Sequence, residues 1–507
     1  MGNTTRRNFL KSATAAVGAG VAARSYAAGR SRVRKPNLLF LWTDEQRADT
    51  MRVYGNDKIS VPNLNRLADE SIVFERAYVS QPVCTPSRST VMTGLWPHTT
   101  GCTKNNIPLP TDVPCLPEIV NDPAYRTAYM GKWHLGDEIF RQHGFDEWQS
   151  IEDNYIKYYR NGRDKSARSQ YWHFLNDLGY KPDEKNIYNR TYASNLPIGH
   201  SKPAFLEKHA CDFIRRHSDR PFMLYVNFLE PHPPYNGPFN DIYDPDTDVA
   251  LPNNFNDPLE DNEPVRCIKR RQDVWTKKVQ GIQLRTDDAW RSLVARYWGL
   301  VTEVDHAVGN ILDTLDELGL ADNTIVVYTS DHGDMMGSHK MLYKSVMYEE
   351  ATRIPWLMRV PQLGRRQRII KKPVSHIDLV PTLLDLMGAK TKTDLPGQSL
   401  VPLIKGGTVA EEDVFIEWRP HFDWNSELLK NRSPNVHTKS KTESRIRTVV
   451  TPDGWKLCLA DNDRSELFNL NTDPGETKNL FYEKQYAPII EKLTAKIRAW
   501  QKRVGDA

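Results

Sequence analysis

Four short apolar segments, each followed at once by a polar cluster, constrain the fold of this chain more than any other feature. They span residues 37–42, 125–130, 221–228 and 324–330. Short, largely apolar segments of this length are typical of strands buried on both faces of a parallel sheet. Helical patterns at 203–217 and 290–318 lie between them. Strands that alternate with helices predict a doubly wound α/β fold, which binds its ligands where the strands end.

The pattern changes after residue 403, and 507 residues exceed what one simple core holds. Short apolar strands separated by turn residues are predicted at 414–418, 446–450 and 455–460. A helical pattern follows at 487–502. This order predicts a small antiparallel sheet with one helix. We therefore expect a large α/β catalytic domain over 36–405 and a smaller C-terminal subdomain over 410–507.

The first 28 residues have the pattern of an export signal. Arg6 and Arg7 precede an apolar run at 13–23 and the sequence Ser25-Tyr26-Ala27, whose small first and third residues suit cleavage. A disordered basic tail, the alternative, does not explain this order. We expect a twin-arginine signal over 1–28 and a periplasmic or secreted protein. Without the four basic residues of the signal, the formal net charge falls from +4 to about zero. Charge therefore gives no argument for a nucleic-acid partner, and no later segment is apolar over a membrane-spanning length.

The six cysteines include no C-x-x-C pair, so the sequence predicts neither a structural zinc site nor a disulfide scaffold. Cys102 and Cys115 are candidates for one disulfide in an oxidising compartment, and the sequence leaves that bond open.

Cys84 differs from the others because it begins the segment Cys84-Thr85-Pro86-Ser87-Arg88. Pro86 suits the first turn of a helix, where its missing N–H costs nothing. Cys84 would then lie at the positive end of a helix dipole, with the Arg88 guanidinium close by. Such a position suits an anion or a nucleophile.

Two further sets of polar residues follow the predicted strands. The first contains three carboxylates and one imidazole: Asp44, Glu45, Asp331 and His332. Such a set suits Ca²⁺ or Mg²⁺ better than zinc. The second contains two lysines and two histidines: Lys132, His134, His232 and Lys344. Beside a metal, these groups suit the binding and discharge of a tetrahedral oxyanion. Each residue alone is more often a surface acid, a helix cap or a structural histidine, as we expect for His98, His143, His209 and His217.

Taken together, these motifs resemble the type I, formylglycine-dependent sulfatases of the alkaline phosphatase-like superfamily. The signature C-x-P-S-R begins at Cys84 and is followed by Thr93-Gly94. Residues 131–136 are similar to the second signature of that family, and 331–333 to its metal-binding motif. Residues 467–480 are similar to its C-terminal motif. The resemblance implies a large mixed, mostly parallel sheet flanked by helices, with a smaller C-terminal subdomain.

The resemblance also implies a chemistry. A maturation enzyme would oxidise Cys84 to Cα-formylglycine, whose hydrate would attack sulfur and then expel sulfate. The ligands of Ca²⁺, or of Mg²⁺ as an alternative, would be Asp44, Glu45, Asp331, His332 and the modified Cys84. Arg88 and Lys132 would fix the hydrate and a sulfate oxygen. His134 would be the base, and His232 and Lys344 would contact sulfate and protonate the leaving oxygen. Many members have Asp-Asp where this chain has Asp44-Glu45, and His332 stands where Asn is common.

Fewer sequence features bear on the substrate than on the reaction. The run 331–337, with Lys344 and Glu349-Glu350, is similar to bacterial glycan sulfatases, and an export signal agrees with a glycan met outside the cytoplasm. The irregular segment 155–192 carries aromatic side chains that suit either stacking on sugar rings or packing on the sheet: Tyr155, Tyr158, Tyr159, Tyr171, Trp172 and Tyr192. We predict a hydrolase that removes O-sulfate from a sulfated carbohydrate.

Three alternatives stay open. A phosphonate monoester or phosphate diester hydrolase of the same superfamily would share the metal site and the modified cysteine. An inactive, sulfatase-like glycan-binding protein would keep the fold without the chemistry, although the intact Cys84, Arg88, Lys132 and His134 argue against it. An enzyme that uses the Cys84 thiol directly is the third, and no other feature of the sequence requires a thiolate.

Overall fold

The computed structural model describes residues 35–258, 262–390, 393–420 and 444–506. The described residues from 36 onward form one compact unit, and the export signal expected over 1–28 lies outside the described residues. None of the described helices combines the length and the apolarity that crossing a bilayer requires.

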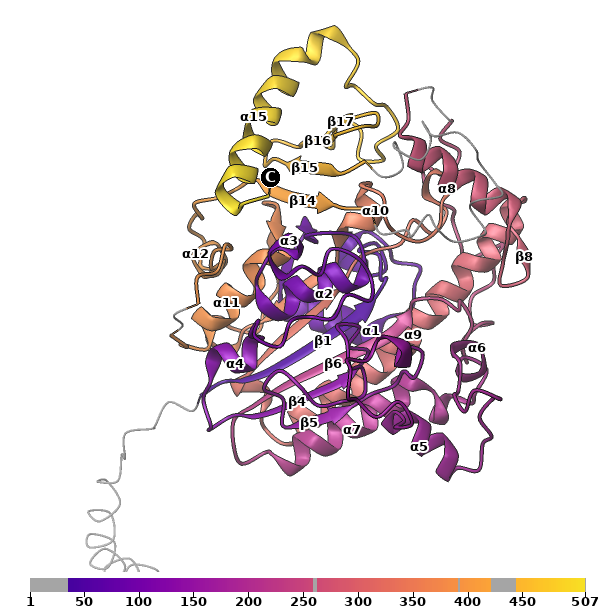
Figure 1. The fold of residues 1–507 in the computed structure, drawn as a ribbon, viewed down its shortest axis with the longest axis vertical. Coiled ribbons are helices and arrows are strands. Elements are labelled where there is room, and N and C mark those ends of the chain that lie inside the picture. The colour runs from indigo at the N-terminus through magenta and orange to yellow at the C-terminus, as the bar shows by residue number, and fades with distance from the viewer. Residues whose placement is uncertain (1–34, 259–261, 391–392, 421–443, 507) are drawn as a thin grey trace, which may run out of the picture. The chain divides into compact units, whose positions relative to one another are not determined.

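An eight-stranded mixed sheet forms the centre of this unit (Figure 1). In sheet order its strands are β12 (Arg368–Ile370), β2 (Ile72–Phe74), β11 (Trp356–Arg359), β9 (Thr324–Ser330), β1 (Asn37–Asp44), β6 (Phe222–Pro231), β4 (Arg126–Gly131) and β5 (Glu147–Gln149). Neighbouring strands are parallel except at β11, which runs antiparallel to β9 and β2. The predicted mixed, mostly parallel α/β fold is confirmed. The four strands predicted from apolar runs are neighbours in the sheet.

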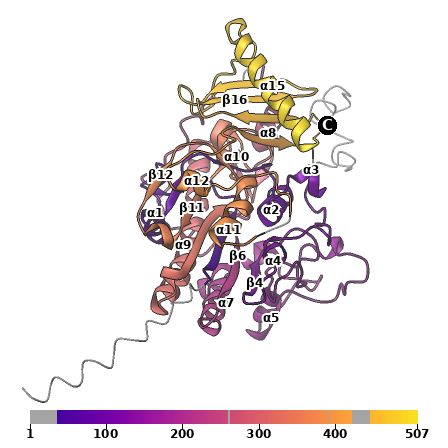
Figure 2. The ribbon, with the colours of Figure 1, turned by 90° about the vertical axis from the view of Figure 1, so that its left-hand side faces the viewer.

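Strand β1 shows why the sheet needs a helix layer on each face. All eight of its residues are buried, and successive side chains point to opposite faces. Leu39 and Leu41 belong to one hydrophobic core and Leu38, Phe40 and Trp42 to another. The first core is completed by α1 (Pro62–Asp69), α7 (Lys202–Arg216) and α9 (Asp287–Glu317). The second is completed by α2 (Cys84–Thr93), α4 (Leu116–Val120) and α11 (Leu379–Leu386). Figure 2 shows these helices on the two sides of the sheet.

The long helix α9 starts where its sequence favours a helix start. The hydroxyl of Thr286 accepts the backbone N–H of Ala289, which caps the first turn. Asp287 and Asp288 place negative charge at the positive end of the helix dipole. Over its 31 residues α9 packs against α7 and β6.

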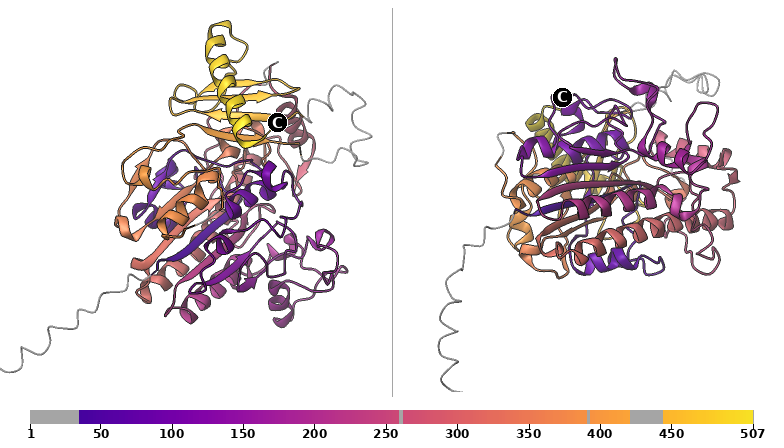
Figure 3. Two further views of the ribbon diagram at one scale, coloured as in Figure 1. Left: turned by 60° about the vertical axis from the view of Figure 1, so that its left-hand side comes forward. Right: turned by 90° about the horizontal axis from the view of Figure 1, so that it is seen from below.

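The C-terminal segment forms the predicted antiparallel sheet with one helix. Its strands pair in chain order as β14 (Val414–Trp418), β15 (Ile446–Val450), β16 (Trp455–Ala460) and β17 (Glu466–Asn469). Helix α15 (Ala487–Val504) packs on this sheet through Leu493, Ile497 and Trp500 (Figure 3). The sequence predicted the first three strands with these bounds and missed β17. The boundary expected between 405 and 410 stays a prediction.

The remaining elements are short and lie in the connections. The helices are α3 (Pro97–Thr100), α5 (Gln170–Asp177), α6 (Arg190–Ala193), α8 (Val265–Thr276), α10 (Glu349–Thr352) and α12 (Val401–Ile404). The strands are β3 (Ala77–Tyr78), β7 (Lys278–Val279), β8 (Ile282–Gln283), β10 (Arg353–Ile354) and β13 (Val374–Ser375). The segment 155–192, which the sequence describes as irregular, follows the edge strand β5, contains α5 and includes the start of α6.

The close contact between β4 and β6 gives a testable prediction. Gly131 ends β4 with a φ of 116°, and a Cβ there would lie 1.9 Å from the backbone oxygen of Asn227 in β6. We expect Gly131→Ala to lower the free energy of unfolding by roughly 3 kcal/mol or more, because backbone atoms must move and L side chains avoid this φ.

Denaturant unfolding measures the effect. Gly199→Ala is the matched control, because its Cβ would meet no described atom within 4 Å, and it should cost less than about 1 kcal/mol. Equal stability of the two variants would contradict the packing of β4 on β6.

Candidate active site

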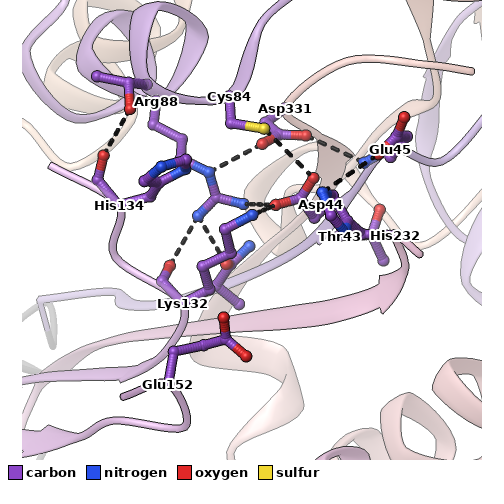
Figure 4. Close-up of polar contacts among 12 residues, drawn as sticks. Thr43, Asp44, Glu45, Cys84, Arg88, Lys132, His134, Glu152, His232 and Asp331 are labelled. Atoms are coloured by element: carbon purple, nitrogen blue, oxygen red, sulfur yellow. Dashed lines mark hydrogen bonds and ion pairs between the residues drawn. The ribbon is translucent and has the colours of Figure 1, made fainter. Parts of the chain in front are cut away.

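Most of the predicted site residues lie together at the ends of neighbouring strands (Figure 4). Asp44 and Glu45 lie at the end of β1, and Asp331 and His332 directly follow β9. Lys132 and His134 follow β4, and His232 follows β6. The carboxyl ends of parallel strands meet at one edge of a sheet. Two overlapping groups with ligand atoms within 4.8 Å of one another contain all five predicted metal-binding residues: Asp44, Cys84, Asp331 and His332 in one, and Asp44, Glu45 and His232 in the other.

Cys84 is the first residue of α2 and is 1% exposed. Its Sγ lies 3.2 Å from His332 Nε2 and 3.8 Å from Asp44 Oδ1. Burial and Asp44 raise the pKa of the thiol, but Lys344, Lys132 and His332 together bring it below its ordinary value. The predicted helix start is confirmed. A group at this position therefore lies among cations as well as at the positive end of a helix dipole.

Arg88 lies one turn further along α2 and holds the two strand ends together. Its Nε donates to Asp331 Oδ2 and its Nη2 to Asp44 Oδ2, both at 2.8 Å. Its Nη1 donates to the Lys132 carbonyl at 2.7 Å and to Asn227 Oδ1 at 2.8 Å. Four of its five N–H donors thus bind groups of the protein. The fork positions the ligands of the predicted metal, while the expected contact of Arg88 with sulfate stays a prediction.

Two lysines supply the remaining positive charge. Lys132, fully buried, forms an ion pair with Asp44 Oδ2, and Lys344 Nζ lies 2.7 Å from Glu45 Oε2. When Asp44, Glu45 and Asp331 are ionised, the positive charges of Arg88 and these two lysines balance the three negative charges. Burial would raise the pKa of Asp44, but Lys132 and its other positive neighbours hold it well below the usual range.

The residues present fit a divalent cation. Glu45 Oε1 is buried and has no hydrogen-bond partner among the described residues. Burial raises the pKa of Glu45 well above its ordinary value although Lys344 opposes this, so the carboxyl lacks a further positive charge. His332 Nδ1 lies 2.9 Å from the Gly333 carbonyl, which fixes the tautomer and leaves Nε2 facing Cys84 and Asp331. Burial lowers the pKa of His332, but Asp331 and Cys84 raise it to about 9, so a cation bound at Nε2 would replace a proton.

His134 is set up to accept a proton. Its Nε2 lies 3.0 Å from Asn106 Oδ1, to which it donates, and its buried Nδ1 has no partner within the part of the chain that the structure describes. Burial, followed by the charges of Lys132 and Arg88, lowers the pKa of His134 well below its ordinary value. The ring is therefore neutral, with a free lone pair on Nδ1.

His232 and Lys344 lie at the accessible side of the site, each with a side chain 14% exposed. His232 Nδ1 lies 2.8 Å from the Pro233 carbonyl, to which it donates, and Nε2 lies 3.5 Å from Glu45 Oε2. Burial, followed by the charge of Lys344, lowers the pKa of His232 well below its ordinary value.

Sequence reasoning missed four residues that build the site. Asn227 joins Arg88 to the Trp42 carbonyl, and Asn106 orients His134. Glu138 accepts the N–H groups of Trp133 and His134 at 2.8 and 2.7 Å, which shapes the loop after β4. Arg190 comes from the segment 155–192, and its Nη1 lies 3.4 Å from His232 Nδ1. Only Asn227 could have been recognised from the sequence, because it is an amide at the end of an otherwise apolar run.

The aromatic residues of the segment 155–192 lie in different surroundings. The Tyr155 ring lies 4.4 Å from that of His134, between centroids, so it borders the site. Tyr159 and Tyr171 are buried, which favours the packing interpretation for them. Tyr192 is 37% exposed.

The four histidines that the sequence analysis expects to be structural have ordinary partners. His98, His143 and His217 lie beside Glu417, Glu118 and Glu147, and His209 packs on Phe205. All six cysteines lie in the described part of the chain and are free, buried thiols, Cys102 and Cys115 included.

Comparison with protein families identifies the class. The family model described as Sulfatase matches residues 36–389, and one described as N-sulphoglucosamine sulphohydrolase, C-terminal, matches residues 337–503. The first match covers more than half of the chain. The chain therefore belongs to the sulfatase family and is, by that membership, a sulfuric ester hydrolase.

Relatives of known function are distant but cover most of the chain. An ulvan-active sulfatase of Formosa agariphila is 28% identical over 490 residues, which make up 93% of this chain and 82% of the relative. An N-acetylglucosamine-6-O-sulfatase of Bacteroides thetaiotaomicron is 25% identical over 535 residues, with 94% and 88% covered. The solved phosphonate monoester hydrolase of Agrobacterium radiobacter has a TM-score of 0.75 at 20% identity, with 92% of this chain and 96% of that chain covered. This last likeness shows the fold alone, and it confirms the expected architecture.

The acidic cluster gives a second prediction. Ca²⁺ should raise the free energy of unfolding relative to protein in chelator, by about 2.7 kcal/mol at 100 times its Kd. Asp331→Asn should abolish this shift, because it removes a charged ligand from the cluster. Calorimetry with and without Ca²⁺ measures the shift within each variant, so any general loss of stability cancels.

Glu118→Gln is the matched control, because Glu118 belongs to a separate cluster with Cys115 and His143. It should keep the Ca²⁺ shift. A shift that survives Asp331→Asn would place the stabilising cation elsewhere.

Proposed function

We propose that this protein removes O-sulfate groups from a sulfated carbohydrate, with a Cα-formylglycine derived from Cys84 as nucleophile and Ca²⁺ in the acidic cluster. The observation that carries the proposal is the position of Cys84. Its Sγ begins a buried helix and faces Asp44 and His332, which come from two different strands. Oxygen in place of that sulfur would lie where the cluster and the helix end both stabilise negative charge.

The charge of the site suits a sulfate ester. The three carboxylates of Asp44, Glu45 and Asp331 are matched by the three cations Arg88, Lys132 and Lys344. A divalent cation would then leave the site with two positive charges in excess, which attracts a monoanionic ester. Phosphate diesters carry the same charge, so charge alone does not separate the two substrates.

Asp44, Asp331 and His332, with Glu45, would hold the cation, and Mg²⁺ is the alternative to Ca²⁺. When bound, the cation supplies Lewis-acid activation of the nucleophile and of a sulfate oxygen. When present, the formylglycine hydrate supplies two hydroxyl groups, one for attack on sulfur and one for release of sulfate. Lys132 would hold a sulfate oxygen while Arg88 keeps the carboxylates in register.

His134 would take the proton that must leave before sulfate is released. Its Nδ1 lone pair is free and its ring is neutral over the physiological range, which is what a general base requires. Asn106 holds the tautomer by accepting from Nε2. Thr85, next to Cys84, donates to the His134 carbonyl at 2.8 Å, which ties the base to the start of α2.

His232 and Lys344 would face the leaving oxygen, since they are the predicted residues on the accessible side. Lys344 is cationic and can donate to that oxygen directly. His232 is neutral in the absence of substrate. The negative charge of a bound sulfate would raise its pKa, so substrate binding itself favours the protonated ring that can act as acid.

Three further observations support a carbohydrate outside the cytoplasm. One relative is named for ulvan and another for an N-acetylglucosamine sulfate, although both are distant. The twin-arginine pattern at 1–28 supports export. We propose that a maturation enzyme acts on Cys84 and that the exported enzyme meets sulfated glycans in the periplasm or outside.

Turnover of an aryl sulfate compared with an aryl phosphate diester tests the proposed reaction. We expect kcat/KM to favour the sulfate. A large preference for the diester would assign the chain to phosphate or phosphonate ester hydrolysis, and no turnover of either ester or of any sugar sulfate would support an inactive glycan-binding protein.

Substitution of Cys84 gives a third prediction. Cys84→Ala and Cys84→Ser should each lower turnover of a sulfate ester by at least roughly 10³-fold, because an alanine methyl group cannot become the formyl group and a maturation enzyme that oxidises a thiol does not act on a serine hydroxyl. Circular dichroism should show the fold intact. Cys211→Ala, at a buried cysteine of α7, is the matched control and should keep activity. Full activity of Cys84→Ser would show that an ordinary hydroxyl suffices.

A further inference from the structure

A pocket beside His232 carries two buried carboxyl groups that the reaction does not use. It is a small pocket, open to solvent on one side, and its lining includes Arg190, Lys202, Glu230, His232, Gly237 and Glu303. His232 connects it to the active site, because its Nε2 lies 3.5 Å from Glu45 Oε2. Arg190 Nη1 lies 3.4 Å from the other nitrogen of the same ring.

One oxygen of each of these two carboxyl groups lacks a partner, although the Glu303 carboxyl also bonds to Ser201, while a third carboxylate pairs with both cations. Glu152 accepts from Arg190 Nε at 2.8 Å and also pairs with Lys202. Glu230 Oε2 and Glu303 Oε1 are buried and have no hydrogen-bond partner in the described chain. Glu303 comes from α9 and is 4% exposed. Buried acceptors of this kind are normally paired, so an unpaired couple facing a pocket points to a ligand.

The pocket is kept open by a residue without a side chain. A Cβ on Gly237 would lie 2.8 Å from Leu300 Cδ2 and 3.3 Å from Glu303 Oε2. The φ angle of Gly237 is not left-handed, so the backbone conformation does not require glycine at this position. The absent Cβ instead leaves room in front of the Glu303 carboxyl.

The charges favour a neutral ligand group. Three carboxyls, Glu152, Glu230 and Glu303, face two cations, Arg190 and Lys202. Burial, followed by the charge of Glu230, raises the pKa of Glu303 to about 8. With that proton in place the group is neutral, and the pocket offers both an O–H donor and carboxylate acceptors. A hydroxyl group, which both donates and accepts, matches this arrangement.

We propose that this pocket binds a hydroxyl group of the sugar that carries the sulfate, with Glu230 and Glu303 as its partners, and that it makes the enzyme prefer sugar sulfates to aryl sulfates. The inference rests on the proposed function. A site built to bond a hydroxyl discriminates strongly against substrates that lack it, because its own polar groups are then left unpaired.

The ratio of two rate constants tests the proposal. We would measure kcat/KM for the sulfate monoesters of glucose, galactose and N-acetylglucosamine, take the best of the three, and divide it by kcat/KM for 4-nitrophenyl sulfate. Glu303→Met, which removes donor and acceptor but keeps volume, should lower this ratio by about 10- to 100-fold. Glu303→Gln keeps a donor and an acceptor, as the protonated acid does, and should retain most of the ratio. Gly237→Ala, which narrows the pocket, should lower it.

Glu317→Met is the matched control, at an exposed position near the end of the same helix, and should leave the ratio at the wild-type value. If Glu303→Met left the ratio unchanged, the proposal would be wrong. Equal slowing of both substrates would make Glu303 a structural residue, and no slowing of either would show that the reaction does not need it. Preference for the free amine of glucosamine sulfate over all three neutral sugars would overturn the assignment to a hydroxyl.

The same measurement separates this inference from the proposed function. Wild-type protein that hydrolyses 4-nitrophenyl sulfate but none of the three sugar esters would contradict the pocket assignment and the carbohydrate substrate, and would leave sulfate ester hydrolysis standing. Wild-type protein that hydrolyses an aryl phosphate diester and no sulfate ester would overturn the proposed function, and the pocket assignment with it.

Discussion

The site depends on one buried interaction, the fork of Arg88 between Asp44 and Asp331. The three side chains are completely buried, and they join helix α2 to the ends of two adjacent strands. A buried ion pair of this kind repays its desolvation only with good geometry and further hydrogen bonds. The Lys132 carbonyl and Asn227 provide those bonds. Removing one partner would leave an unpaired buried charge, so the fork fixes where the carboxylates stand before any cation binds.

The fork also explains how cations and carboxylates coexist without a strong excess of either charge. Arg88, Lys132 and Lys344 each pair with a carboxylate, and these pairs place Cys84 Sγ near His332 and Asp44. The unpaired Glu45 Oε1 marks where a further positive charge is missing. The arrangement is preorganised, because the groups that would stabilise charge during reaction are already held by the fold.

Much of the fold could be predicted from the sequence, because apolar runs of strand length directly report burial. The runs at 324–330 and 414–418 became β9 and β14 with unchanged bounds. β11 was missed because nothing local distinguishes an antiparallel strand inserted between β9 and β2. The site residues were found because they follow strand ends in recognisable motifs. Asn106, Glu138 and Arg190 were not, since they lie in loops or inserts and meet the site only through tertiary contacts. The pocket with Glu230 and Glu303 was equally invisible, because it joins β6 to the middle of α9.

The central claim is that Cys84 is the precursor of the working nucleophile rather than the nucleophile itself. The mass of the peptide that contains Cys84, determined in protein from its native host and compared with the sulfatase activity of the same sample, tests this claim most directly. We expect a peptide lighter by the difference between a thiol and an aldehyde side chain, in a proportion that follows activity from sample to sample. Fully active protein in which this peptide retains its thiol would contradict it.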